Sequence, residues 1–141
     1  MAFIDDLLAR PGTLSAGSRY SVANGVIYLA LGLMFIAWPG ATQTLFMDRP
    51  FVGDEQALFR VLGLTVVVIG WLYVFGGRTG GRQFSAASVI DRWIFVPGVL
   101  VPLAIAGVFP HVLLAFAILD VTLAVGAWVL LRRTRPTPSG E

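Results

Sequence analysis

Four long runs of apolar residues alternate with short polar segments along the chain. The runs cover residues 21–38, 57–75, 88–108 and 111–131. A helix that spans a membrane needs about 20 mostly apolar residues, so each run is long enough to be a candidate span. The pattern predicts an all-α fold, a membrane-embedded four-helix bundle. The connection between the third and fourth runs is very short, so we expect these two helices to be antiparallel neighbours.

The segments that flank the runs are polar or amphipathic. Residues 1–20 predict a cytoplasmic amphipathic leader, because one face of a short helix there carries Phe3, Ile4, Leu7 and Leu8. Residues 21–133 then form a single four-span domain, and the polar residues 134–141 predict a disordered cytoplasmic tail. Composition agrees with a membrane protein, since 57% of the residues are hydrophobic and only 13% are charged.

The arginines predict the orientation of the bundle. Most of the basic residues precede the first span, lie between the second and third spans, or follow the fourth: Arg10, Arg19, Arg78, Arg82, Arg132, Arg133 and Arg135. Four spans place all three regions on one side of the membrane. The positive-inside rule therefore predicts a multi-pass protein of the cell inner (plasma) membrane with both termini in the cytoplasm.

The third run contains two prolines and two opposite charges. Pro97 and Pro102 each remove a helical hydrogen bond, so we expect the third helix to be kinked. Asp91 and Arg92 are adjacent and diverge by about 100° on a helix. We expect Arg92 to extend to the inner interface. The shorter Asp91 would need a donor inside the bundle, such as Tyr73, Asn24 or an arginine.

Seven polar residues are predicted at membrane depth and are the candidates for a buried pocket: Asn24, Tyr28, Arg60, Tyr73, Asp91, Arg92 and Asp120. Charged groups at this depth usually face the interior of a bundle. Asp120 shares its helix face with alanines and Arg60 shares its face with glycines, so both are predicted to point inward and to pair. Two interpretations stay open, namely ion pairs that only fix helix register and a functional pocket. His111 is expected to cap the fourth helix or lie at the outer interface.

Several kinds of site are excluded or disfavoured by composition. The chain has no cysteine and one histidine, so it has no disulfide or thiolate chemistry, and we predict no metal site. No catalytic residue can be named, and the sequence favours a protein that is not an enzyme. No cofactor is required, although a quinone or a lipid would suit a polar pocket in a membrane. The arginines are dispersed, which disfavours nucleic-acid binding.

The charges and their spacing resemble those of a known group of proteins. The second run opens with "FRVLGL", the third contains "DRW", and the fourth, "LLAFAILDVTLAVGAWVLLRR", has an aspartate near its middle. Over about residues 21 to 133 this layout resembles small bacterial four-helix membrane proteins of the DoxX-like kind and neighbouring families. The resemblance implies that Arg60, Arg92 and Asp120 are the first positions to compare. Some members of that group look like membrane subunits of quinone-linked oxidoreductases.

Three functions follow as expectations. The first is an accessory or scaffold subunit of a larger membrane complex, which would contact membrane lipids and a protein partner or further copies of itself. The second is a lipid- or quinone-binding membrane protein with a buried polar pocket, either on its own or as part of an oxidoreductase. The third is a proton-coupled carrier, which would need a homo-oligomer because four helices are too few for an inverted-repeat transporter.

Overall fold

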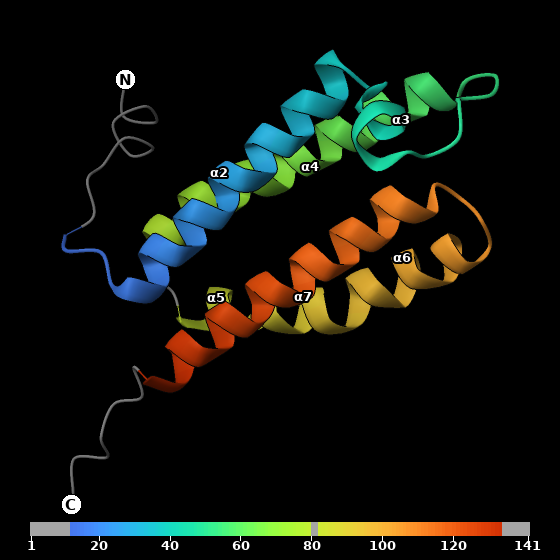
Figure 1. Cartoon of the computed structure of the whole chain (residues 1–141). Coiled ribbons are helices and arrows are strands. Elements are labelled where there is room, and N and C mark those ends of the chain that lie inside the picture. Colours follow the sequence, from blue (N-terminus) through green and yellow to red (C-terminus); the bar gives the residue numbers. More distant parts are fainter. Residues whose placement is uncertain (1–11, 80–81, 134–141) are drawn as a thin grey trace, which may run out of the picture.

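The protein is a bundle of long helices in this computed structural model, which describes residues 12–79 and 82–133 (Figure 1). Four helical stretches among these residues are long and apolar enough to cross a membrane, as the sequence predicted. The third stretch is interrupted by a π-helical turn, η1. The elements in chain order are α2 (Ala16–Ala37), α3 (Ala41–Phe46), α4 (Glu55–Arg78), α5 (Arg82–Ile90), η1 (Asp91–Phe95), α6 (Val96–Ile105) and α7 (Pro110–Arg133).

The first span begins at Ala16 rather than at the predicted residue 21. Ser15 is its N-cap, and the Ser15 Oγ accepts a hydrogen bond from the Ser18 N–H at 3.1 Å. This cap satisfies a backbone donor that the first turn of a helix cannot pair internally. The predicted amphipathic face at residues 3–8 and the predicted tail at 134–141 lie outside the described residues.

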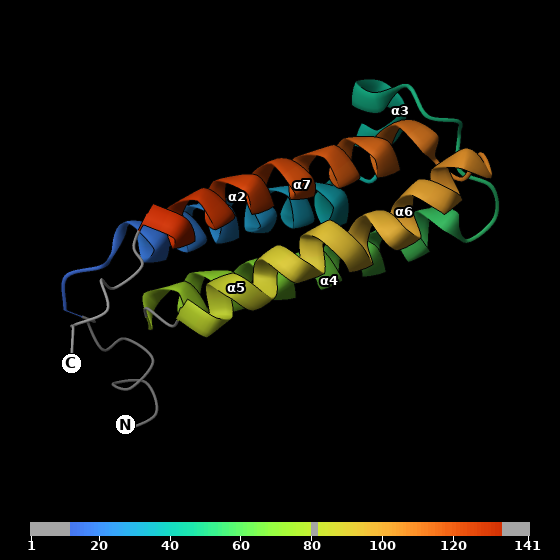
Figure 2. The same cartoon turned by 90° about the horizontal axis from the view of Figure 1, so that it is seen from below.

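The four spans are arranged as two helical hairpins stacked on each other (Figures 1 and 2). The first hairpin pairs α2 with α4, and the second pairs α5, η1 and α6 with α7. Between the hairpins, α7 lies close to α2 and α5 lies close to α4, whereas the backbones of α4 and α6 are farther apart. The boundary between the two hairpins, called the seam below, is therefore widest between the backbones of α4 and α6.

Glycines bring α2 and α4 into close contact. A Cβ atom added at Gly32 would lie 2.6 Å from the Gly63 carbonyl oxygen, and one added at Gly70 would lie 2.6 Å from the Leu29 nitrogen. Small residues at such positions let two membrane helices approach until their backbones touch. The backbone contact makes this hairpin the most tightly packed pair in the protein.

The seam is filled by aromatic side chains near the α3 end of the bundle. Phe35, Phe59, Phe109 and Val112 form the buried cluster there. The Phe35 and Phe59 rings meet edge to face with centroids 5.2 Å apart, an arrangement that aromatic rings favour. This cluster joins the two hairpins at one end and leaves the middle of the seam to polar residues.

The irregularity of the third span lies just before the first of its two prolines. The turn Asp91–Phe95 is π-helical, and the Val96 N–H donates to the Asp91 carbonyl. Pro97 lies in the first turn of α6, where its missing N–H costs little, while Pro102 lies inside α6. The wider π turn makes room for the Pro97 ring, which in a regular helix would clash with the carbonyl one turn earlier.

Candidate functional site

Arg92 is the centre of a buried polar cluster in the seam. Only 2% of its surface is exposed. Its guanidinium carbon lies 4.4 Å from the centroid of the Tyr73 ring and 5.1 Å from that of Tyr28. An arginine is attracted to the faces of aromatic rings, and the attraction is stronger away from water. The two tyrosines, one from α4 and one from α2, therefore hold the Arg92 side chain between the hairpins.

Asp120 supplies the negative charge of this cluster from α7. Its Oδ1 atom accepts a hydrogen bond from the Tyr28 hydroxyl and lies 4.0 Å from the Arg92 Nε. The neighbouring inward positions on α7 are the buried residues Ala117 and Ala124, as the sequence predicted. These short side chains leave room for the longer polar groups of the facing helices.

The outer nitrogens of Arg92 form no hydrogen bond within the described part of the chain. Neither Nη1 nor Nη2 has a hydrogen-bond acceptor among the residues that the structure describes, and both atoms are buried. An arginine is always protonated, so these are charged donors. Burying such donors without acceptors is costly. These two nitrogens are therefore charged donors that could still bind an acceptor oxygen.

The structure brings five of the seven predicted residues to the interior. Asn24, Tyr28, Tyr73, Arg92 and Asp120 are buried. Asn24 lies one turn from Tyr28 on the same face of α2. The five side chains come from all four spans.

Arg60 does not belong to this cluster, and its predicted pairing with Asp120 is wrong. Its side chain is exposed and lines a shallow surface depression with Asp54 and Gln56. The inward position on that turn of α4 is taken by Phe59, which is part of the aromatic core. Asp120 is instead within ion-pair distance of Arg92.

The expected roles of Asp91 and Arg92 are reversed. Asp91 is exposed and Arg92 is buried. Ser88 is buried one turn before Arg92, so Arg92 continues the inward face of α5 into the π turn. The arginine side chain is long enough to reach the interface, but the interior offers it two tyrosine rings and the Asp120 carboxylate.

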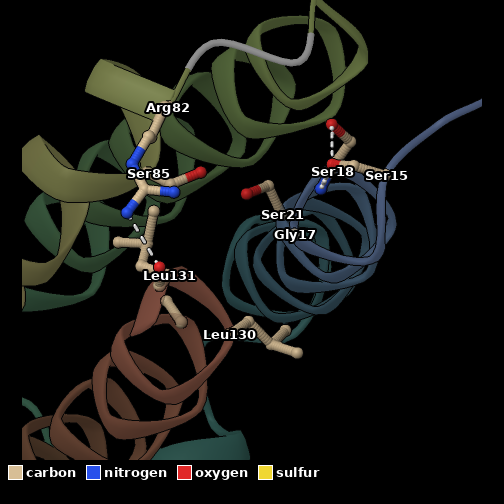
Figure 3. A pocket seen from close by; sticks show the side chains of 9 residues that line it. Ser15, Gly17, Ser18, Ser21, Arg82, Ser85, Leu130 and Leu131 are labelled. Atoms are coloured by element: carbon tan, nitrogen blue, oxygen red, sulfur yellow. Dashed lines mark hydrogen bonds between the residues drawn. The ribbon is translucent and has the colours of Figure 1, made fainter. Parts of the chain in front are cut away.

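A pocket of about 190 Å³ lies at the end of the seam where α2 begins (Figure 3). The Arg82 guanidinium beside it donates to the Leu131 carbonyl at 2.8 Å. This pocket was not predicted from the sequence, although serines spaced three apart are its signal. The lining residues from α2, α5 and α7 are Ser15, Gly17, Ser18, Ser21, Arg82, Ser85, Ala127, Leu130 and Leu131.

The seam changes character along its length. Ser21, Ser85 and Ala127 of the serine-lined pocket are followed one turn deeper by Asn24, Ser88 and Ala124, and then by Tyr28, Arg92 and Asp120. Beyond this cluster is an apolar cavity of about 80 Å³. It is lined by Phe35, Phe59, Leu62, Val66, Leu100, Val112, Leu113 and Phe116. Along the seam, a polar layer is therefore followed by a charged layer and then by an apolar layer.

Comparisons with known proteins add no family. No protein-family model, curated protein or solved structure matches the chain. The resemblance to DoxX-like proteins therefore stays a prediction. Among the described residues, no group of three or more histidine, aspartate or glutamate side chains is placed to hold a metal ion. What the fold and the site define is a small four-span membrane protein with a charged cluster buried between its hairpins.

Proposed function

We propose that this protein binds an uncharged amphiphile, a lipid or a quinone, whose polar head lies at Arg92. The observation that carries the proposal is that Arg92 is 2% exposed while its Nη1 and Nη2 have no acceptor in the described part of the chain. The planar guanidinium offers these donors side by side, which suits a molecule with carbonyl or ester oxygens. The faces of Tyr28 and Tyr73 beside it suit a flat or apolar head group.

The balance of charge favours an uncharged ligand over an anion. The positive charge of Arg92 already faces the carboxylate of Asp120 at 4.0 Å. A second anion would leave the buried cluster with a net negative charge, which is expensive away from water. A carbonyl oxygen would instead accept from Arg92 and leave the charge of the cluster unchanged.

The surroundings of Arg92 support a ligand with an apolar tail. The apolar cavity begins on the same helix faces, since Phe116 lies one turn from Asp120 and Phe35 lies two turns from Tyr28. The apolar cavity is lined from both hairpins, by Leu62 and Val66 of α4 and by Leu100 of α6. A tail could therefore lie toward the aromatic end while the head occupies the polar cluster.

The test is a titration of the purified protein in a mild detergent, followed by its intrinsic tyrosine and tryptophan fluorescence. A decyl-tailed benzoquinone and a diacylglycerol serve as uncharged ligands, and phosphatidic acid serves as the anionic counterpart. We expect saturable binding of at least one uncharged ligand and weaker binding of phosphatidic acid. Tighter binding of phosphatidic acid, or no saturable binding of any of the three, would overturn the proposal.

Variants test whether the amphiphile binds at the polar cluster around Arg92. Arg92→Gln should abolish saturation, and Arg60→Gln is the matched control because Arg60 is exposed on the same bundle. If Arg92→Gln does not fold, the double variant Arg92→Gln, Asp120→Asn removes both charges together. Binding that survives in the folded double variant would contradict the assignment to this cluster.

We also propose that both termini face the cytoplasm and that the protein lies in the plasma membrane. The support is the arginines at one end of the bundle, namely Arg19, Arg78, Arg82, Arg132 and Arg133. A reporter fused after Glu141 should be active only in the cytoplasm. Activity on the opposite side of the membrane would disprove this orientation.

An accessory subunit of a larger membrane complex is a second proposed function. One observation favours it specifically, because Asp91 is exposed within the third span. A carboxylate that faces lipid at this depth is expensive, so exposed charges in membrane helices usually have a partner. The two functions are compatible, since Asp91 and Arg92 lie on different faces of the same helix.

A further inference from the structure

Asp91 presents a carboxylate to the outside of the bundle near the middle of a span. The third span runs from Arg82 to Ile105, so Asp91 lies about 14 Å along the helix axis from its start. That distance places it inside the hydrocarbon core of a bilayer. Its side chain forms no hydrogen bond or ion pair with the part of the chain that the structure describes. The nearest cation in sequence, Arg92, faces inward toward Asp120.

The surface around Asp91 is shaped for close approach by another helix. Exposed residues on the same span include Ala87, Ile94, Phe95, Gly98 and Val99. A Cβ atom added at Gly98 would meet no atom within 4 Å, so this glycine opens onto the surface. Small residues next to large apolar ones are typical of contacts between membrane helices.

The third span is also the least covered of the four. Only 22% of its most apolar stretch is buried, compared with 33% for the first and fourth spans. The π turn Asp91–Phe95, in which every residue except Arg92 is exposed, lies at the centre of this face, and π turns often occur at functional sites. We call the surface formed by Ala87, Asp91, Ile94, Phe95, Gly98 and Val99 the outward face.

We infer that the outward face docks a membrane-spanning helix of another protein, and that this helix carries a lysine or arginine at the depth of Asp91. This inference rests on the proposed accessory role and is independent of amphiphile binding. Charge complementarity identifies the partner, because a basic side chain would convert the lipid-facing carboxylate into a charge-assisted pair. The small residues of the outward face would let the partner's backbone come close enough for that pair to form.

A second copy of this chain is a poorer occupant of the outward face. Among the described residues, the exposed arginine that lies farthest inside a span is Arg60, about 8 Å along the axis from the opposite end of its helix. The other exposed arginines of the spans, Arg19, Arg82, Arg132 and Arg133, lie in terminal turns, about 9 Å or more along the axis from the depth of Asp91. In two copies with the same orientation, Arg60 and Asp91 would therefore differ in depth by roughly 14 Å. An arginine side chain does not reach across that difference.

The experiment uses a defined probe helix in place of an unidentified partner. The purified protein is placed in nanodiscs with a synthetic leucine–alanine spanning peptide that has one central lysine, and association is measured by energy transfer between dyes on the two molecules. Matched peptides have leucine or glutamate at the central position. We expect the lysine peptide to bind the unmodified protein at least about tenfold more tightly than the leucine peptide, a ratio that corresponds to about 1.4 kcal/mol. The glutamate peptide should bind least.

Variants of the protein locate the contact and separate the two proposals. Asp91→Leu should remove the preference for lysine, and Asp91→Asn should reduce it. Asp91→Leu should still bind the uncharged amphiphile, whereas Arg92→Gln should lose the amphiphile and keep the preference for the lysine peptide. Melting temperature and gel filtration verify that each variant is folded.

Two results would overturn the inference. One is equal binding of the lysine and leucine peptides to the unmodified protein, a comparison that needs no variant to fold. The other is an oligomer of the protein alone that depends on Asp91 and excludes the lysine peptide, which would assign the outward face to a second copy.

Discussion

The carboxylate of Asp48 caps the N-terminus of α7 by accepting a hydrogen bond from the backbone N–H of Val112. Its Oδ2 accepts a hydrogen bond from the Val112 N–H at 2.8 Å, and its Oδ1 accepts one from the His111 N–H at 3.0 Å. The Asp48 side chain is fully buried, and α7 begins at Pro110, so these are donors of the first turn. A negative charge at the N-terminus of a helix also interacts favourably with the helix dipole. The loop after α3 is thereby tied to the last span.

Replacing Asp48 with alanine should lower the stability of the bundle. We expect a loss of about 1–2 kcal/mol, since removal of a helix cap leaves first-turn donors unpaired. Asp48→Asn should lie between alanine and the unmodified protein, because its amide oxygen still accepts. The measurement is the melting temperature in detergent. Asp54→Ala is the control, because Asp54 precedes α4 without a side-chain cap bond, and an equal effect of the two alanine variants would contradict the capping role.

The spans could be predicted from the sequence because a helix that crosses a bilayer must have about 20 mostly apolar residues, and such runs can be read directly from the chain. Pattern and spacing also identified the inward faces around Asp120 and Tyr28, which are buried as expected. Which cation meets Asp120 could not be predicted in the same way. That choice depends on how the two hairpins stack, a relation between segments far apart in the chain. It decides that Phe59 rather than Arg60 turns inward.

The capping role of Asp48 was equally hidden. In the sequence Asp48 is adjacent to Arg49, and nothing distinguishes it from the other charged residues of the same loop. Its carboxylate reaches α7 only because α3 and the residues after it bring the loop back over the bundle. The ion pair between Arg49 and Glu55 joins residues that are close in sequence, whereas the cap joins residues separated by two complete spans.

Asp120 should depend on Arg92 rather than on Arg60. Asp120→Leu leaves the guanidinium without its countercharge and should cost about 3–5 kcal/mol, the usual range for one broken partner of a buried pair. Asp120→Asn should cost less, because the amide can still accept from the Tyr28 hydroxyl. In a double-mutant cycle, Arg92→Leu should partly rescue Asp120→Leu, whereas Arg60→Leu should be additive with it. Additivity for both arginines would argue against the pair.

The contact between α2 and α4 should not tolerate a methyl group. An added Cβ at Gly70 would lie 2.6 Å from the Leu29 nitrogen and 2.8 Å from the Gly25 carbonyl oxygen. Both are backbone atoms, so Gly70→Ala should separate the helices and cost roughly 1–3 kcal/mol by overpacking. Gly98→Ala is the matched control, since its Cβ would meet nothing within 4 Å. Thermal unfolding of the two variants in one detergent compares them, and similar melting temperatures would refute the close contact.

Pro97 should be needed for ligand binding more than for folding. Its ring favours the π turn that precedes it, and that turn sets the rotation of Arg92 relative to α6. Pro97→Ala would permit a regular α-helix through Asp91–Phe95, which would turn Arg92 away from Tyr28 and Tyr73 while restoring a backbone hydrogen bond. We therefore expect an unchanged or higher melting temperature together with weaker binding of the uncharged amphiphile.

Pro102 separates that effect from the general cost of proline in a helix. It lies inside α6, beyond the π turn, so Pro102→Ala should raise the melting temperature without weakening binding; in a helix interior proline is about 3 kcal/mol worse than alanine. Fluorescence titration and thermal unfolding of both single variants give the comparison. If Pro97→Ala bound the amphiphile as tightly as the unmodified protein, the π turn would have no part in positioning Arg92. Equal loss of binding in the two variants would instead assign the effect to the shape of the whole third span.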